Sequence, residues 1–411
     1  MTTPTTPPAA PRPIRTAATL VVLRDGTEGL EVLMLRRAEK ANDQNSGASV
    51  FPGGMVDAHD RLLHPLCAGL DDAAASERLG LPEGGLDFHA AAIRECFEEA
   101  GLLLANDAQG RPVELLTLTS GELDAMRAAA ERSTDALLAL CAARGWCLAV
   151  DRVAYFSHWL TPPGMPRRFD TRFFAAAMPA GQDVRPDGRE TVEHMWLKPA
   201  DAVSPARGLK LLNVTRRVLE HLATFACVDD FMRHARALRR IPLTMPRLAD
   251  GPSGRRPVNM EEPAYDEIGH LDPDGQGGGR YALEAGLVTP LSARVLRLVH
   301  DSGLNSFLIG GSEGWALINR VPGDAAHEAA LRGAAPGPVQ WVLSTDSAVQ
   351  SLNLGGATLH VLGARGFLLA EERMLFTHDA ADTAAVETDH LVEWIVPPRG
   401  FMRRPASVLA D

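Results

Sequence analysis

Three glutamates at helical spacing are the residues of this chain best suited to chemistry. Glu95, Glu98 and Glu99 occupy positions i, i+3 and i+4 of the run 91–102, and on a helix these positions share one face. Glu95 and Glu99 would repel each other, and the last two acids would add to the negative charge of the helix C-terminus. A sequence selected only for helix stability would place Lys or Arg there. The spacing therefore indicates either a binding site or a solvated acidic face.

A hard divalent cation would remove this repulsion. Mg²⁺ and Mn²⁺ prefer oxygen ligands, and proteins commonly hold them with a few carboxylates together with substrate phosphates. If the spacing marks a binding site, Glu95, Glu98 and Glu99 would bind one of these ions. Asp87 is expected to cap the N-terminus of the helix, and Gly101 is expected to end it.

The residues around these glutamates resemble the Nudix box. Residues 94–102 read Arg-Glu-Cys-Phe-Glu-Glu-Ala-Gly-Leu, similar to the second half of the box, Arg-Glu-apolar-x-Glu-Glu-x-Gly-apolar. The first half, two glycines followed by an acid, is present in 51–60, which read Phe-Pro-Gly-Gly-Met-Val-Asp-Ala-His-Asp. Asp57 and Asp60 stand where the family usually has Glu. The two halves lie much farther apart than in the family pattern, so we interpret 61–86 as an insertion within the box.

This resemblance implies that residues 14–245 form a Nudix hydrolase domain. The implied fold is α/β, an α/β/α sandwich with a mixed sheet. The implied reaction is metal-assisted attack of water on the diphosphate of a small-molecule nucleoside diphosphate linked to another group, X. Such chemistry requires charge neutralisation and an oriented water more than covalent catalysis. The implied cofactor is Mg²⁺ or Mn²⁺, and the implied ligands are Glu95, Glu98, Glu99 and the carbonyl of Gly53.

Acids outside the box are further catalytic candidates. In the family, an acid ahead of a tryptophan in the last strand often serves the metal or the water, and here Glu190 and Glu193 precede Trp196. The resemblance does not decide whether one of these two acids activates the water, or whether Glu98 or Glu99 does.

Three further residues of the box are candidates for a role in the site. Arg94 lies one turn from Glu98 on the predicted helix and is expected to orient it. Asp57 and Asp60 are weaker candidates, because their side chains are shorter than the glutamates of the family.

Arginines are the candidates for binding the diphosphate. Arg167, Arg168 and Arg172 cluster at the start of an aromatic-rich strand, and forked guanidinium groups suit an anionic diphosphate. An ordinary loop with surface arginines is the alternative explanation. Further candidates for substrate binding are Arg36, Arg37 and Gly54.

Two segments resemble the Nudix branch of the peroxisomal coenzyme A diphosphatases, which also has an insertion in the box. Residues 33–38 read Leu-Met-Leu-Arg-Arg-Ala and residues 47–54 read Gly-Ala-Ser-Val-Phe-Pro-Gly-Gly, similar to the coenzyme A motif of that branch. Asn42 stands where the motif has a second Arg. The candidates for X are coenzyme A or an acyl-coenzyme A, a nucleotide sugar, ADP-ribose and a dinucleotide. A nucleotide-binding sensor without turnover and an assembly protein of the same fold are the alternative functions.

Composition excludes several classes of protein. The 411 residues are 45% hydrophobic and 23% charged, which is typical of a folded chain of two or three domains. The net charge of −11 comes without a basic stripe, so we expect no nucleic-acid partner. Five scattered cysteines indicate a reducing, cytoplasmic setting, and no apolar run is long enough for a membrane span. Residues 1–13 are expected to be a disordered lead.

The C-terminal third is expected to form a separate, smaller domain. Residues 246–280 are rich in Pro, Gly and Asp, which predicts a linker. Residues 281–411 predict a β-rich α/β domain that faintly resembles a metallo-β-lactamase fold, in part through 371–379. The metal-binding histidine motif of that fold should follow the strand near 340, but 344–348 contain no histidine. We therefore expect a degenerate, non-catalytic domain that serves packing or homodimerisation.

Overall fold

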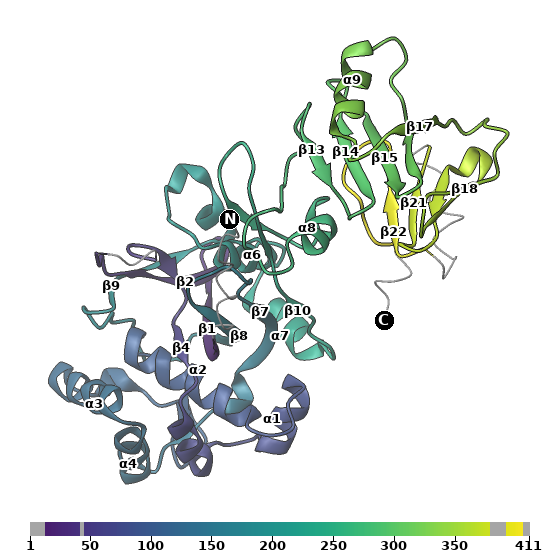
Figure 1. Cartoon of the computed structure of the whole chain (residues 1–411). Helices are drawn as coiled ribbons and strands as arrows, with labels where there is room; N and C mark the ends of the chain where they lie inside the picture. Colours follow the sequence, from purple (N-terminus) through teal and green to yellow (C-terminus); the bar gives the residue numbers. More distant parts are fainter. Residues whose placement is uncertain (1–12, 42–44, 379–391, 406–411) are drawn as a thin grey trace, which may run out of the picture. The chain divides into compact units, whose positions relative to one another are not determined.

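The computed structural model describes residues 13–41, 45–378 and 392–405 of the chain. Almost all of the expected disordered lead 1–13, as well as Asn42 and Asp379, lie outside these described residues. The chain divides into two compact units, one formed by Met1–Thr161 with Pro166–Thr244 and the other by Pro162–Met165 with Met245–Asp411 (Figure 1).

A mixed sheet forms the centre of the first unit. Its strand order is β10-β7-β8-β1-β2-β3, with β4 also paired to β1 and β9 also paired to β2. The pairs β1–β8 and β10–β7 are parallel, and the other pairs are antiparallel. The strands are β1 (Ile14–Gly26), β2 (Gly29–Arg37), β3 (Ser49–Val50), β4 (Gly53–Met55), β7 (Ala154–Leu160), β8 (Arg168–Ala177), β9 (Thr191–Leu197) and β10 (Leu243–Thr244).

Strand β1 pairs with three other strands of this sheet, namely β8, β4 and β2. Along one edge it pairs with β8 from Ile14 to Leu23. Along the other edge it pairs first with β4, through Ala17 to Thr19, and then with β2. Its apolar side chains alternate between two buried clusters, one on each face of the sheet. Strands β1 and β2 form an antiparallel β-hairpin.

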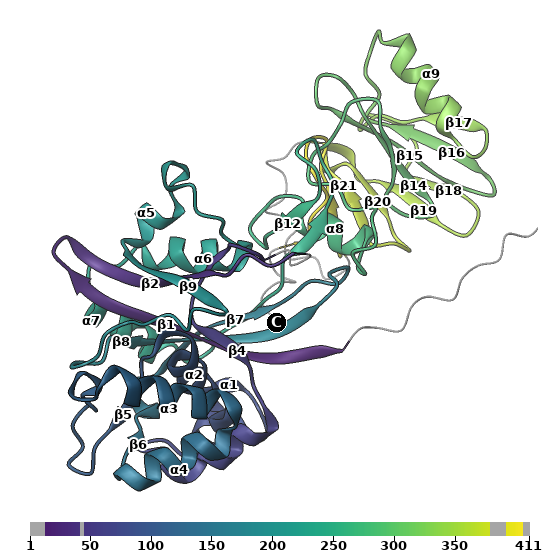
Figure 2. The same cartoon turned by 90° about the vertical axis from the view of Figure 1, so that its left-hand side faces the viewer.

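Helices cover both faces of the sheet (Figure 2). The buried cluster on one face unites the sheet with α2 (Gly85–Ala100), α1 (Asp72–Leu79), α3 (Ser120–Arg132), α4 (Thr134–Arg144) and the 3₁₀ helix η1 (Ala58–Leu66). The cluster on the other face unites it with α5 (Pro199–Val203), α6 (Asn213–Leu222) and α7 (Val228–Ala237). The predicted α/β/α sandwich with a mixed sheet is therefore confirmed.

The predicted insertion 61–86 folds against the start of α2. Asp72 of α1 accepts hydrogen bonds from the backbone N–H groups of Gly84 (3.0 Å) and Leu86 (2.9 Å). N–H groups at a helix N-terminus have no partner within the helix itself. Helix α2 begins at Gly85, after the left-handed Gly84 at φ 78°. The expectation that Asp87 is the N-cap is therefore wrong, because a carboxylate from another helix performs this role.

The second unit contains two five-stranded sheets that enclose one buried cluster. One sheet has the order β13-β14-β15-β16-β17 and the other β18-β19-β20-β21-β22. Helix α9 (Ala325–Ala334) lies between β16 and β17 in the chain. The strands are β13 (Val288–Pro290), β14 (Val295–Val299), β15 (Asn305–Gly311), β16 (Gly314–Ile318), β17 (Val339–Val342), β18 (Ser351–Asn353), β19 (Thr358–Val361), β20 (Phe367–Leu369), β21 (Met374–Phe376) and β22 (Trp394–Val396). The predicted β-rich character is confirmed, whereas the metallo-β-lactamase resemblance stays a prediction.

The predicted linker 246–280 requires a correction. It contains β11 (Arg247–Ala249), β12 (Arg256–Val258) and α8 (Tyr265–Leu271). Glu267 of α8 forms a doubly hydrogen-bonded ion pair with Arg297 of β14, with both contacts at 2.7 Å and both side chains buried. The segment is thus part of the second unit. Its Pro- and Gly-rich composition could not reveal a buried partner 30 residues away.

No helix among the described residues is long and apolar enough to cross a membrane.

Close packing of α1 on α2 leads to a stability prediction. A Cβ atom at Gly85 would lie 2.2 Å from the backbone nitrogen of Ser76. Gly85→Ala is therefore expected to lower the free energy of unfolding by about 1–3 kcal/mol, because one of the two helices must shift. Equilibrium urea unfolding of the full chain measures this effect.

The matched control is Gly121→Ala in α3. Among the described residues, no heavy atom lies within 4 Å of a Cβ atom at this position. This variant is expected to be as stable as the wild type or more stable by up to about 1 kcal/mol. Equal urea midpoints for Gly85→Ala and the wild type would contradict the prediction.

Candidate active site

Helix α2 carries the three glutamates at the border of the core. Its apolar side chains are buried in the sandwich, and its C-terminus is closed by Gly101, as predicted, with φ 73° and an N–H bond to the Phe97 carbonyl. The side chains of Glu95 and Glu98 are each 15% exposed, and Glu99 is 6% exposed. The acids are therefore largely removed from water, unlike those of a solvated helix face.

Arg94 lies at the centre of this acidic group. Its guanidinium binds both carboxylate oxygens of Asp60, with Nε–Oδ1 at 2.7 Å and Nη2–Oδ2 at 3.1 Å. Nη1 contacts Glu95 at 2.9 Å and Glu98 at 3.3 Å, and Nη2 also donates to the Met55 carbonyl at 3.0 Å. Asp60 is fully buried. One guanidinium thus connects both halves of the box.

The paired glycines at β4 let this strand approach the helix closely. The backbone N–H of Gly53 donates to Oε2 of Glu99 at 3.0 Å. A Cβ atom at Gly54 would lie 2.5 Å from the carboxyl carbon of Glu95. No side chain larger than hydrogen fits there without moving this carboxylate. The role of the Gly53 carbonyl as a metal ligand stays a prediction.

Burial raises the pKa values of all three glutamates. It raises the pKa of Glu98 to about 7, against the opposing effect of Arg94, and also raises the pKa of Glu95. Burial raises the pKa of Glu99 to about 8; the Gly53 N–H opposes this shift, and Glu95 and Glu190 add to it. The site thus contains more negative charge than its protein cations balance.

Burial by itself would lower the pKa of Arg94, but the hydrogen bond to Asp60 and the charges of Glu95 and Glu98 raise it overall. The guanidinium therefore stays charged within the site. Arg37 is a second cation whose charge reaches the acids, because it lowers the pKa of Glu99.

The donor set suits a hard divalent ion, although the acids point to protein groups. Within residues 13–41, 45–378 and 392–405, no three Asp, Glu, His or Cys side chains converge closely enough to hold a metal ion. The reason is visible in the contacts: Glu95 and Glu98 turn to Arg94, and Glu99 turns to the Gly53 N–H. Metal binding would require these carboxylates to rotate by one or two side-chain torsions.

The structure separates the two acids of the last strand. Glu190 directly precedes β9, and its charge raises the pKa values of Glu95 and Glu99. Glu193 instead pairs with Arg36 at 2.8 Å, from opposite positions on β9 and β2. Glu190 therefore belongs to the electrostatic surroundings of the glutamates, and Glu193 is held by Arg36.

The turn before β9 contains residues that sequence reasoning missed. The Thr191 hydroxyl donates to the Glu99 carbonyl at 3.0 Å and joins β9 to the end of α2. Asp187 accepts hydrogen bonds from the backbone N–H groups of residues 189–191 and shapes the turn that carries Glu190. A short Asp-Gly turn signal was present in the sequence, but nothing local indicated its contact with the helix.

The three arginines predicted to bind the diphosphate, one just before β8 and two within it, occupy different environments. Arg167 is exposed, and Arg168 is partly buried with its Nε bound to the Thr161 carbonyl at 3.0 Å. Arg172 is 4% exposed, lies 4.4 Å from the Phe88 ring centroid and contacts Asp170 at 3.1 Å. Arg172 thus packs β8 against α2, and the role of the three arginines in substrate binding stays a prediction.

Comparisons with known proteins identify the family. A model of the NUDT19 Nudix domain matches residues 62–210. The chain is 30% identical over 271 residues to the acyl-coenzyme A diphosphatase NUDT19 of Gallus gallus, covering 54% of this chain and 70% of that protein. The chain belongs to the Nudix hydrolase family, in the NUDT19 branch. It is also 28% identical over 286 residues to NUDT19 of Homo sapiens, covering 60% of this chain and 72% of that protein.

Among solved structures, a Nudix hydrolase from Alicyclobacillus acidocaldarius is 29% identical, with a TM-score of 0.45, covering 54% of this chain and 96% of that one. The predicted resemblance to the coenzyme A diphosphatase branch is thus confirmed by the relatives in sequence.

The raised pKa values predict an unusual pH dependence of stability. Glu98 and Glu99 titrate near 7 and 8 in the folded chain, compared with 4.5 for an ordinary glutamate. Between these values the folded state binds more protons than the unfolded state, so stability falls as the pH rises through this window. Thermal unfolding in EDTA is expected to show a midpoint that decreases from about pH 5 to about pH 8.5.

The double variant Glu98→Gln with Glu99→Gln should flatten this decrease, because both titrating groups are removed. Glu220→Gln, at an exposed position of α6, is the control and should retain the wild-type slope. A midpoint that rises across the window in the wild type would show that these carboxyls ionise normally.

Proposed function

We propose that this chain hydrolyses the diphosphate of coenzyme A or of an acyl-coenzyme A with the help of Mg²⁺ or Mn²⁺. The observation that carries the proposal is the cluster of Glu95, Glu98 and Glu99, buried without enough balancing positive charge. Relatives named acyl-coenzyme A diphosphatase support the substrate class. So do the coenzyme A-like segments 33–38 and 47–54.

Each residue of the cluster has a role in this reaction. Glu95, Glu98 and Glu99 would hold the divalent ion, which when bound neutralises charge on the phosphate oxygens. Arg94, fixed by Asp60, orients Glu95 and Glu98. The close packing at Gly54 limits the positions open to the Glu95 carboxylate. Contacts on the buried side of the site thus hold these carboxylates in position.

The water must be oriented by an acid near the metal ligands. Glu190 is a stronger candidate than Glu193, because its charge reaches Glu95 and Glu99 whereas Glu193 is paired with Arg36. Glu98 and Glu99 remain candidates as well, since their raised pKa values suit proton transfer near neutral pH. Attack of water on the diphosphate would release a 3′-phosphorylated adenosine monophosphate and phosphopantetheine or its acyl thioester.

Arginines on the open side would bind the diphosphate. The charge of Arg37 lowers the pKa of Glu99, which supports a role for this arginine at the site. Arg36 on β2, Arg168 on β8 and Arg167 just before β8 are exposed or partly exposed. We place the activity in a reducing compartment such as the cytoplasm; no disulfide joins any of the five cysteines, all of which are described.

Turnover of coenzyme A tests this proposal. Wild-type protein with Mg²⁺ or Mn²⁺ is expected to release 3′,5′-ADP from coenzyme A, measured by chromatography. Glu98→Gln should lower the rate on the order of 10²-fold or more, because one metal ligand is lost. Glu220→Gln on α6 is the control and should be unchanged. Metal-dependent cleavage of ADP-ribose or a nucleotide sugar, but not of coenzyme A, would refute the substrate.

Gly54→Ala tests the arrangement of the site without removing a functional group. The added Cβ atom would displace the Glu95 carboxylate, and such displacement is expected to lower kcat/KM for coenzyme A by about tenfold or more. Gly121→Ala in α3 is the matched control. Wild-type kcat/KM in Gly54→Ala would show that the position of Glu95 does not matter for turnover.

A further inference from the structure

The second unit contains a polar cavity that the proposed hydrolysis does not use. Its volume is about 460 Å³, and it lies between α8 and the starts of β21 and β22. Its walls include both signs of charge beside an aromatic ring: Arg247, Asp266, His270, Glu372, Trp394 and Arg404. This volume suits a small organic ligand.

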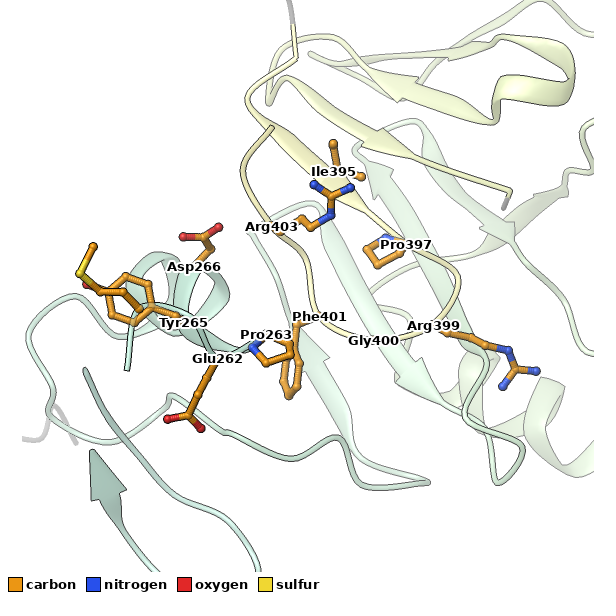
Figure 3. Close-up of a pocket in the computed structure, with 11 residues that line it drawn as sticks. Glu262, Pro263, Tyr265, Asp266, Ile395, Pro397, Arg399, Gly400, Phe401 and Arg403 are labelled. Atoms are coloured by element: carbon orange, nitrogen blue, oxygen red, sulfur yellow. The ribbon is translucent and has the colours of Figure 1, made fainter. Parts of the chain in front are cut away.

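A neighbouring cavity of about 340 Å³ shares Asp266 with the first one. Figure 3 shows Tyr265 and Asp266 projecting from α8 on one side of this neighbour, and Pro397, Arg399 and Arg403 on the other. Its lining is mainly apolar, with Pro263 and Phe401 among the contributors. Both cavities have charged side chains in their walls, but the larger one has the more polar lining.

Arg247 supplies a cation without a protein counter-ion. Among the described residues its guanidinium makes no ion pair, and its buried Nε has no hydrogen-bond partner. It lies 4.6 Å from the ring centroid of Tyr265, and a Cβ atom at Gly269 would be 2.1 Å from its central carbon. A glycine in α8 thus leaves room for the guanidinium at the cavity wall.

Glu372 supplies an anion with an unused oxygen. Its Oε2 is buried and lacks a hydrogen-bond partner within the described part of the chain. The next residue, Arg373, has a left-handed backbone at φ 55°, and its carbonyl accepts the N–H groups of Glu393 at 2.9 Å and Trp394 at 3.1 Å. Two hydrogen bonds therefore hold this uncommon conformation next to Glu372.

The other polar groups of the cavity have protein partners. Asp266 accepts the backbone N–H of Arg404 at 3.0 Å, and His270 Nε2 donates to the Leu291 carbonyl at 2.8 Å. The His270 ring also packs edge-on against Trp394, with centroids 4.8 Å apart. By contrast, no ion pair joins Arg247 to Glu372 among the described residues, although both line the same cavity. The positive charge of Arg247 and the negative charge of Glu372 thus remain available to a ligand at separate places in the cavity wall.

We propose that this cavity binds a small zwitterion of the α-amino-acid class. The carboxylate of the ligand would pair with the forked donors of Arg247. Its ammonium group would pair with Glu372, and an apolar side chain would contact Trp394 and the buried Met374. A ligand with a single charge would leave the opposite protein charge partly buried and unpaired, which is unfavourable.

The twenty protein L-amino acids, added singly at millimolar concentration to the full chain, are the probes. Thermal shift identifies the binder, and calorimetry measures its affinity. We expect at least one amino acid to bind. We also expect its amine-free and carboxylate-free analogues to bind about tenfold more weakly or worse.

Two variants locate the site. Arg247→Gln and Glu372→Gln should each weaken binding by about tenfold or more. Arg399→Gln, which lines only the neighbouring cavity, should bind like the wild type. Near-ultraviolet circular dichroism checks that each variant is folded.

Three results would overturn the proposal: no amino acid binds, binding is unaffected by both variants, or the amine-free analogue binds as tightly as the amino acid. Because the diphosphatase assay uses the other unit, failure of either proposal can be distinguished from failure of the other.

Discussion

The Nudix half of this protein depends on one buried guanidinium. Arg94 contacts Asp60, Glu95 and Glu98 and also a backbone carbonyl. Without Arg94, its carboxylate partners would lie close together, largely removed from water and with little compensating positive charge. Loss of one partner of a buried ion pair typically costs about 3–5 kcal/mol. The same contact joins two parts of the box that are 34 residues apart. The insertion can therefore vary without separating them.

The site also shows a conflict between stability and function. Three carboxylates with raised pKa values oppose folding at neutral pH, and the glycines of β4 bring the strand against them. A sequence under selection for stability alone would replace at least one of these acids. Acids that oppose folding in this way are typical of functional sites.

Local patterns predicted the elements that carry the site, but not the contacts between them. Helical spacing identified the acidic helix, and Gly101 was correctly expected to end it. The cap of α2 could not be predicted, because Asp72 reaches it from another helix. Likewise, the packing of Arg172 against Phe88 could not be predicted, because it arises only in the folded sheet. The segment 246–280 was predicted as a linker because its composition does not reveal the Glu267–Arg297 pair. In each case the deciding partner is distant in sequence.

The pairing of β1 with β8 has a consequence for synthesis of the chain. Ile14 pairs with Arg168, so the central strand lacks its longest partner until most of the first unit has been made. At about 5–20 residues per second, the roughly 150 intervening residues take on the order of ten to thirty seconds to leave the ribosome. During that time β1 presents an open apolar edge to other nascent chains. The strand that organises the finished enzyme is thus also its main aggregation hazard while the chain is still growing.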